Sequence, residues 1–183
     1  MSILALLDEG PAYGLQLRNE FESRTGEIWP LNVGQVYTTL ARLERDGLVR
    51  QRSDDDEKLY EITAAGRQRL GEWFAEPVQR GTPSRDELVL KFVMAVGREG
   101  LRPYDVIQTE RKATVRQLQD YTRLKREADA DADLGWLFLL DSLIFQAEAR
   151  VRWLDACEAR LRRRRPAAKQ RSDSSPQTVE VRP

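Results

Sequence analysis

Between residues 32 and 49, the chain carries polar side chains whose types suit contact with nucleic-acid bases. At about 100° per residue, a helix over this segment turns them away from the apolar Val36 and Leu40. The outward set comprises Gly34, Thr38, Ala41, Arg42 and Arg45, flanked by Gln35 and Tyr37. Glutamine can pair with adenine and arginine with guanine, threonine can touch a thymine methyl, and glycine and alanine allow close approach. This stripe indicates either DNA reading or, as on most amphipathic helices, solvation.

The same segment carries its own folding signals. Asn32 can cap the helix, and Gly47 supplies the left-handed residue that follows its last turn. Val36, Leu40 and Leu43 recur at helical spacing, which predicts a core face.

The composition excludes several classes of protein. The 183 residues contain no histidine and one cysteine, Cys157, which argues against histidine-based catalysis, cysteine-rich zinc sites and an internal disulfide. We therefore expect a protein that is not an enzyme and has no metal site and no cofactor. Cys157 itself is most simply a small buried residue.

We expect the protein to be cytoplasmic, without membrane association. The start "MSILALLDEGP" is too short for the apolar core of a signal peptide. The most apolar run, residues 134–145, is about half the length that a bilayer requires and contains Asp141.

Residues that end helices, and the alternation of apolar and polar residues typical of strands, divide residues 1–76 into a compact series of elements. We expect short helices over 3–7 and 14–26, the helix described above, and a hairpin of strands 48–52 and 58–62. A further helix over 63–75 stops before Pro77. This order predicts a winged helix-turn-helix, whose third helix packs on the first two and enters a major groove.

Beyond a linker over 77–84, residues 85–162 predict an all-helical domain, so the fold class is mainly α. Ser84 and Glu87 suit a capping box, and Pro103 suits the first turn of a long helix. In the last helix, 134–162, apolar residues recur every three or four positions, which is typical of the contact between two packed helices. We expect this stripe to form a dimer interface. Its residues are Trp136, Leu140, Leu143, Ala147, Leu154 and Leu161. The basic tail, 163–183, is predicted to be disordered.

Three stretches resemble the PadR family of transcriptional regulators: "ILALLDEGPAYGLQL", "GQVYTTLARLERDGLV" and "KLYEITAAGRQRL". The helical second half is similar in length and pattern to the longer subfamily, in which this part forms the homodimer. The resemblance implies a dimeric DNA-binding regulator, usually a repressor and often released by a small effector. It also implies that Tyr37 hydrogen-bonds a phosphate.

The wing departs from the often basic wings of the family. Lys58 could meet a phosphate, as could Arg50 and Arg52, but the intervening tip, residues 54–57, is entirely acidic. Residues 1–75 hold nine basic and thirteen acidic side chains, which is unfavourable for DNA contact outside the third helix. We expect a complex dominated by that helix.

Several aromatic residues could line an effector pocket between the two domains, although aromatics at helical spacing more often form core. They are Trp73, Phe92, Trp136, Phe145 and Trp153. Together these features predict a homodimeric regulator that binds an inverted-repeat operator in double-stranded DNA and a small aromatic or hydrophobic effector. The alternative is a winged-helix adaptor that binds protein rather than DNA.

Overall fold

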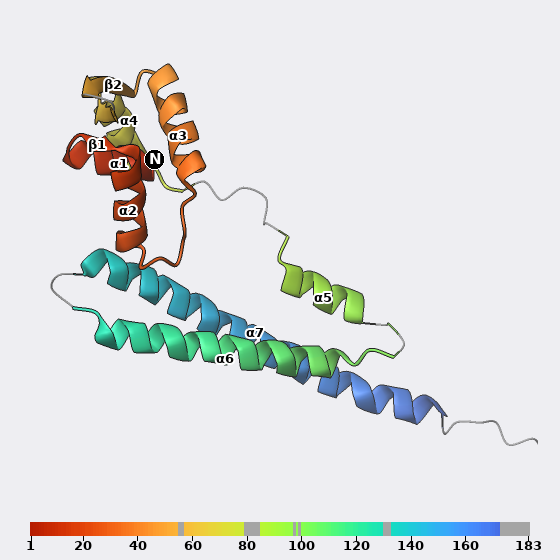
Figure 1. The fold of residues 1–183 in the computed structure, drawn as a ribbon. Helices are drawn as coiled ribbons and strands as arrows, with labels where there is room; N and C mark the ends of the chain where they lie inside the picture. The colour runs from red at the N-terminus through yellow and green to blue at the C-terminus, as the bar shows by residue number, and fades with distance from the viewer. Residues whose placement is uncertain (55–56, 79–84, 97, 99, 130–132, 173–183) are drawn as a thin grey trace, which may run out of the picture. The chain divides into compact units, whose positions relative to one another are not determined.

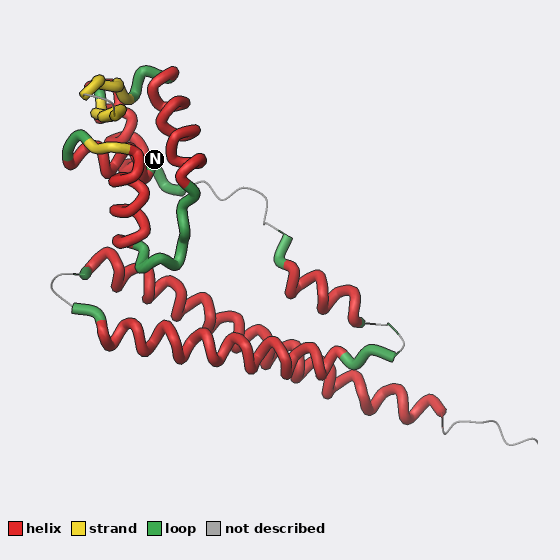
Figure 2. Tube along the Cα trace, viewed as in Figure 1, coloured by secondary structure: helices red, strands yellow, loops and turns green. Residues whose placement is uncertain are grey.

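The computed structural model describes residues 1–54, 57–78, 85–96, 98, 100–129 and 133–172. The chain divides into two compact units, Met1–Thr82 and Pro83–Pro183, which are described separately. Both are built mainly of helices, with one small sheet in the first unit, which confirms the predicted fold class (Figures 1 and 2). In the described ranges, no helix combines the length and the apolar character needed to cross a membrane.

The described part of the first unit contains four helices and three strands, and the predicted helices and hairpin occur in the predicted order. They are α1 (Ser2–Glu9), β1 (Ala12–Tyr13), α2 (Gly14–Arg24), α3 (Val33–Arg45), β2 (Val49–Asp54), β3 (Glu57–Ile62) and α4 (Ala64–Ala75). The side chain of Asn32 accepts a hydrogen bond from the Gly34 amide at 2.8 Å, so it caps α3 as predicted. Gly47, with a φ of 71°, follows α3 as predicted.

The three strands form an antiparallel sheet in the order β1-β3-β2. Strand β1 was not predicted; it pairs Ala12 with Tyr60 and Tyr13 with Leu59. Two residues are too few to show the alternation that identifies a strand in a sequence. The strand ties the start of α2 to the wing.

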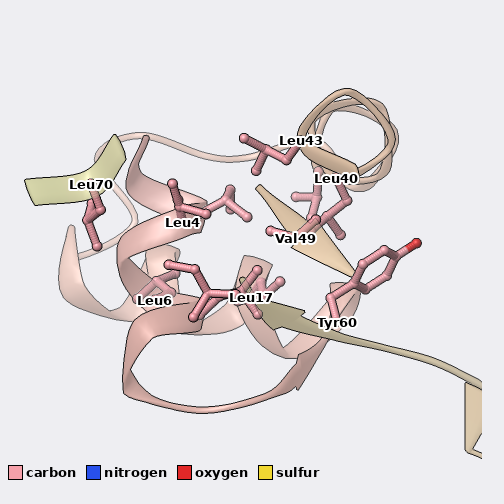
Figure 3. Packing of buried hydrophobic residues seen from close by; sticks show 12 residues of the cluster. Leu4, Leu6, Leu17, Leu40, Leu43, Val49, Tyr60 and Leu70 are labelled. Carbon is pink, nitrogen blue, oxygen red and sulfur yellow. The ribbon is translucent and has the colours of Figure 1, made fainter. Parts of the chain in front are cut away.

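A single core holds the first unit together (Figure 3). One face of each helix and the inner side of the hairpin contribute to it, so α3 is anchored through Val36, Leu40 and Leu43. The buried residues are Ile3, Leu4, Leu6, Leu7, Leu17, Val36, Leu40, Leu43, Val49, Tyr60, Ile62 and Leu70.

The second unit consists of α5 (Glu87–Ala95), α6 (Pro103–Glu127) and α7 (Leu134–Ser172), with α6 and α7 side by side (Figure 1). Asp86 caps α5 by accepting from the amides of Leu88 and Val89, so the observed cap is Asp86, whereas the predicted cap, Ser84, lies outside the described part. The carboxylate of an aspartate is itself a strong N-cap.

Helix α7 extends past the predicted end at residue 162 and includes residues 163–172. The disorder predicted for residues 163–183 stays a prediction, and residues 173–183 lie outside the described part.

Candidate nucleic-acid interface

All the side chains predicted to contact DNA are exposed. Gly34, Gln35, Tyr37, Thr38, Arg42 and Arg45 belong to α3, and Lys58 belongs to β3. On the opposite side of α3, Val36, Leu40 and Leu43 are buried in the core. The helix is therefore fixed by one face and leaves its polar face open.

The arginines of α3 differ in their surroundings. The guanidinium of Arg45 lies 3.2 Å from the carboxylate of Asp46, directly after the helix. Among the described residues, Arg42 has no ion-pair partner. Arg42 can therefore engage an acceptor without first breaking an ion pair.

Tyr37 is 43% exposed, and its ring lies against Gly14 at the start of α2. A Cβ added to Gly14 would lie 2.7 Å from Cε1 of this ring and 3.0 Å from its hydroxyl oxygen. Any other residue at this position would require the Tyr37 ring to shift. The contact places the phenol between α2 and α3, and the need for Gly14 could not be inferred from the sequence.

Arg18 and Glu22 of α2 fix the loop that leads into α3. The carboxylate of Glu22 accepts from the Leu31 amide at 2.9 Å, and Nε of Arg18 donates to the Leu31 carbonyl at 3.0 Å. The two side chains also form an ion pair at 3.0 Å. Because Leu31 directly precedes the cap of α3, this clamp sets where the helix begins. The spacing of four residues suggests a pair on one helix but does not indicate its backbone target.

Thr63 joins the far end of α3 to the wing and to α4. Its hydroxyl donates to the Gly47 carbonyl at 2.8 Å and accepts from the Gly66 amide at 3.0 Å, which caps α4. Its own amide donates to the Leu48 carbonyl at 3.0 Å. The helix is thus held at both ends by hydrogen bonds as well as by the core.

The wing offers few free cations. Arg50 is paired with Glu61 across the two strands, while Arg52 and Lys58 are exposed. The predicted acidic tip includes residues 55 and 56, which lie outside the described part. Burial raises the pKa of the Tyr60 phenol at the base of the wing above its ordinary value.

In the second unit, the predicted dimer stripe is largely covered by the same chain. Leu140, Ala147 and Leu154 are buried, whereas Trp136, Leu143 and Leu161 are partly buried. In this structure, Leu140, Ala147 and Leu154 are covered within the chain, and the dimer interface stays a prediction. A three-four stripe indicates a seam between helices but not whether the second helix belongs to another chain.

Four of the five predicted effector residues belong to the second unit, and there they do not form one group. Phe92 and Trp153 meet edge to face with ring centroids 5.3 Å apart. Trp136 and Phe145 come earlier on α7, roughly 25 Å and 12 Å before Trp153 at 1.5 Å per residue. Trp73 belongs to the other unit, where it contacts Phe74 with centroids 4.8 Å apart.

An open pocket of about 390 Å³ includes Phe92. Phe92, Val93 and Val96 of α5 line it together with Cys157, Arg160 and Leu161 of α7. Among the predicted effector residues, only Phe92 lines this pocket. The effector residues were selected as aromatic, whereas Phe92 is the one aromatic residue among the six that line this pocket.

A polar cluster between α6 and α7 was not predicted. Arg111 donates to the carboxylates of Asp155 and Glu158, each at 2.6 Å, and Glu158 is also paired with Arg162. The hydrogen bond from Arg111 is the main cause of a lowered pKa at Glu158. The same bond is the main cause of the raised pKa of the Arg111 guanidinium.

Comparison with known proteins identifies similar families for both units. Residues 3–72 match the transcriptional regulator PadR-like family, and residues 84–162 match the family model virulence activator alpha C-term. A probable transcriptional regulator of Mycobacterium tuberculosis is 27% identical over 90% of this chain and 97% of its own length. The negative transcriptional regulator PadR of Bacillus subtilis is 25% identical over 85% of this chain and 92% of its own length.

Solved structures extend the likeness to the fold. Bacillus subtilis PadR in complex with operator DNA has a TM-score of 0.67 at 21% identity, covering 86% of this chain and 94% of that one. The same protein in complex with p-coumaric acid has a TM-score of 0.70 at 22% identity, with the same coverage. The Vibrio cholerae virulence activator AphA has a TM-score of 0.64 at 26% identity, covering 87% and 95%.

Proposed function

Because the chain belongs to the PadR-like family of transcriptional regulators, we propose that it is a homodimeric repressor that binds an inverted-repeat operator. The observation that carries the proposal is the open polar face of α3, with the helix anchored by its apolar side and clamped at Leu31. Gln35, Thr38 and Arg42 contact base edges, whereas Tyr37 and Arg45 contact the backbone. Gly34 allows close approach, and Lys58 adds a phosphate contact from the wing. The protein acts on DNA in the cytoplasm.

Exposed apolar side chains on the second unit support the homodimer. Phe138 and Phe145 of α7 are 66% and 63% exposed, and Val93 and Met94 of α5 are also exposed. Large exposed apolar groups of this kind mark interaction sites. Two recognition helices related by a two-fold axis fit half-sites one helical turn apart, or a multiple of a turn.

The pocket beside Phe92 supports an effector site, because its apolar wall and its volume of about 390 Å³ suit a small aromatic or hydrophobic molecule. Bacillus subtilis PadR has been crystallised with p-coumaric acid, which makes this acid a suitable probe. The effector lowers DNA affinity by favouring a dimer geometry in which the two recognition helices no longer match the half-site spacing.

Gel retardation with DNA from upstream of the protein's own gene tests the proposal. We expect retardation at low salt, weakened about tenfold to a hundredfold by Arg42→Ala. Arg116→Ala is the matched control, because Arg116 is exposed on α6 and, among the described residues, has no ion-pair partner. If the folded dimer does not retard any such DNA at low salt, DNA reading is wrong and the protein-binding adaptor is favoured.

A further inference from the structure

The hydroxyl of Thr38 is already engaged within α3. Its Oγ1 donates to the carbonyl of Gly34, one turn earlier, at 2.7 Å. A hydroxyl has only one proton to donate, so this proton is not available to a base. Thr38 is nevertheless exposed, in the middle of the polar face. The Cγ2 methyl of Thr38 therefore remains available for an apolar contact with a partner.

Small neighbours leave this methyl accessible. Gly34 and Ala41 precede and follow Thr38 on the same face, and neither carries a side chain that reaches beyond Cβ. A Cβ added to Gly34 would meet only the Asn32 amide oxygen, at 3.2 Å, so open space surrounds this part of the helix. A flat groove floor can therefore approach the Thr38 methyl closely.

We infer that Thr38 is a specificity-determining residue that reads one thymine per half-site through methyl–methyl contact rather than through a hydrogen bond. The inference rests on the proposed function, in which α3 enters the major groove. There, the C5 methyl distinguishes thymine from every other base. Arg42 lies one turn further along α3, about 6 Å away along the axis, so the thymine lies within about two base pairs of the base that Arg42 contacts.

The experiment uses the full chain and duplexes selected by it from a random-sequence pool. In a selected duplex, each thymine is replaced in turn by deoxyuridine, which removes only the methyl and preserves base pairing. We expect one thymine in each half-site whose replacement weakens binding about fourfold, as loss of one buried methyl requires. Replacements at other positions leave the affinity nearly unchanged.

Two variants assign this effect to Thr38. Thr38→Ser keeps the hydroxyl and removes the methyl, so it should bind the thymine and deoxyuridine duplexes equally well. Thr38→Val keeps the methyl and replaces the hydroxyl, so it should retain the fourfold preference for thymine. Circular dichroism checks that both variants keep the helical content of the wild type.

The outcomes separate this inference from the function on which it rests. If Thr38→Ser keeps the preference or Thr38→Val loses it, another group reads the methyl and the inference is overturned. If Arg42→Ala weakens binding but no deoxyuridine replacement does, the inference fails while DNA reading stands. Enrichment of no duplex at all would overturn both.

Discussion

The ring of Tyr37 in α3 lies against the backbone of Gly14, the first residue of α2, with no room for a side chain between them. The two helices of the helix-turn-helix therefore meet through a contact that places a phenol at the proposed DNA surface. Because this contact depends on the absence of one carbon atom, it can be tested by adding that atom.

Gly14→Ala should displace the Tyr37 ring and weaken operator binding about tenfold, since one phosphate contact is lost and its neighbours shift. Fluorescence anisotropy with a labelled duplex measures the effect. In a Tyr37→Ala background, the added methyl should cost almost nothing, because the ring it meets is gone. An equal loss in both backgrounds would show that Gly14 acts in some way other than through Tyr37.

The clamp at Leu31 gives a second prediction. Glu22→Ala leaves the Leu31 amide and the Arg18 guanidinium without their partner, so the free energy of unfolding should fall by about 1–3 kcal/mol. DNA affinity should fall as well, because the start of α3 loosens. Urea denaturation and anisotropy measure the two effects.

Glu20→Ala is the matched control for this prediction. Glu20 lies on the same helix and pairs with Arg24 at 2.7 Å, but the pair is exposed and the control should change stability by less than about 1 kcal/mol. Equal effects of the two substitutions would contradict a positioning role for Glu22.

The recognition helix could be predicted from the sequence because its signals are local. Asn32, Gly47 and the spacing of Val36, Leu40 and Leu43 lie within one segment, and the structure confirms each of them. Features that depend on distant segments were missed. The sequence places Gly14 more than twenty residues from Tyr37, and nothing in either residue type indicates their contact.

The apolar stripe on α7 also shows that a local sequence pattern does not identify the segment that packs against it. Its period predicted a helix–helix seam, but the residues that cluster with Leu154 belong to α5 and α6 of the same chain. Periodicity describes the face of one helix and contains no information about the identity of its partner. Trp136 and Phe145 likewise lie apart from the Phe92–Trp153 pair, since residue type alone does not bring side chains together.

The cluster around Glu158 predicts how stability depends on pH. Its pKa is lowered from the ordinary value of 4.5, chiefly by the hydrogen bond from Arg111. A group with a lowered pKa stabilises the fold fully above its ordinary pKa and loses this contribution as pH falls through its folded value. We therefore expect Glu158→Gln to destabilise the protein at neutral pH and to flatten the loss of stability below about pH 4.5.

Urea midpoints measured from neutral pH down to the acid transition check this expectation. Glu148→Gln is the control, because Glu148 lies on the same helix and its carboxylate is 3.9 Å from Arg152 in an exposed pair. If the stability of Glu158→Gln depends on pH in the same way as that of the wild type, the charge of Glu158 does not contribute to stability through Arg111.

The two faces of α7 give the last prediction, which separates folding from assembly. Leu154 is fully buried within the chain, so Leu154→Ala should lower the free energy of unfolding by about 2–5 kcal/mol. Phe138 and Phe145 are mostly exposed, so replacing both with serine should leave helix content and monomer stability nearly unchanged while weakening the proposed dimer. Sedimentation equilibrium measures the dimer constant of each variant. A double serine variant that dimerises as tightly as the wild type would exclude this face of α7 from the subunit interface and direct attention to the exposed side chains of α5.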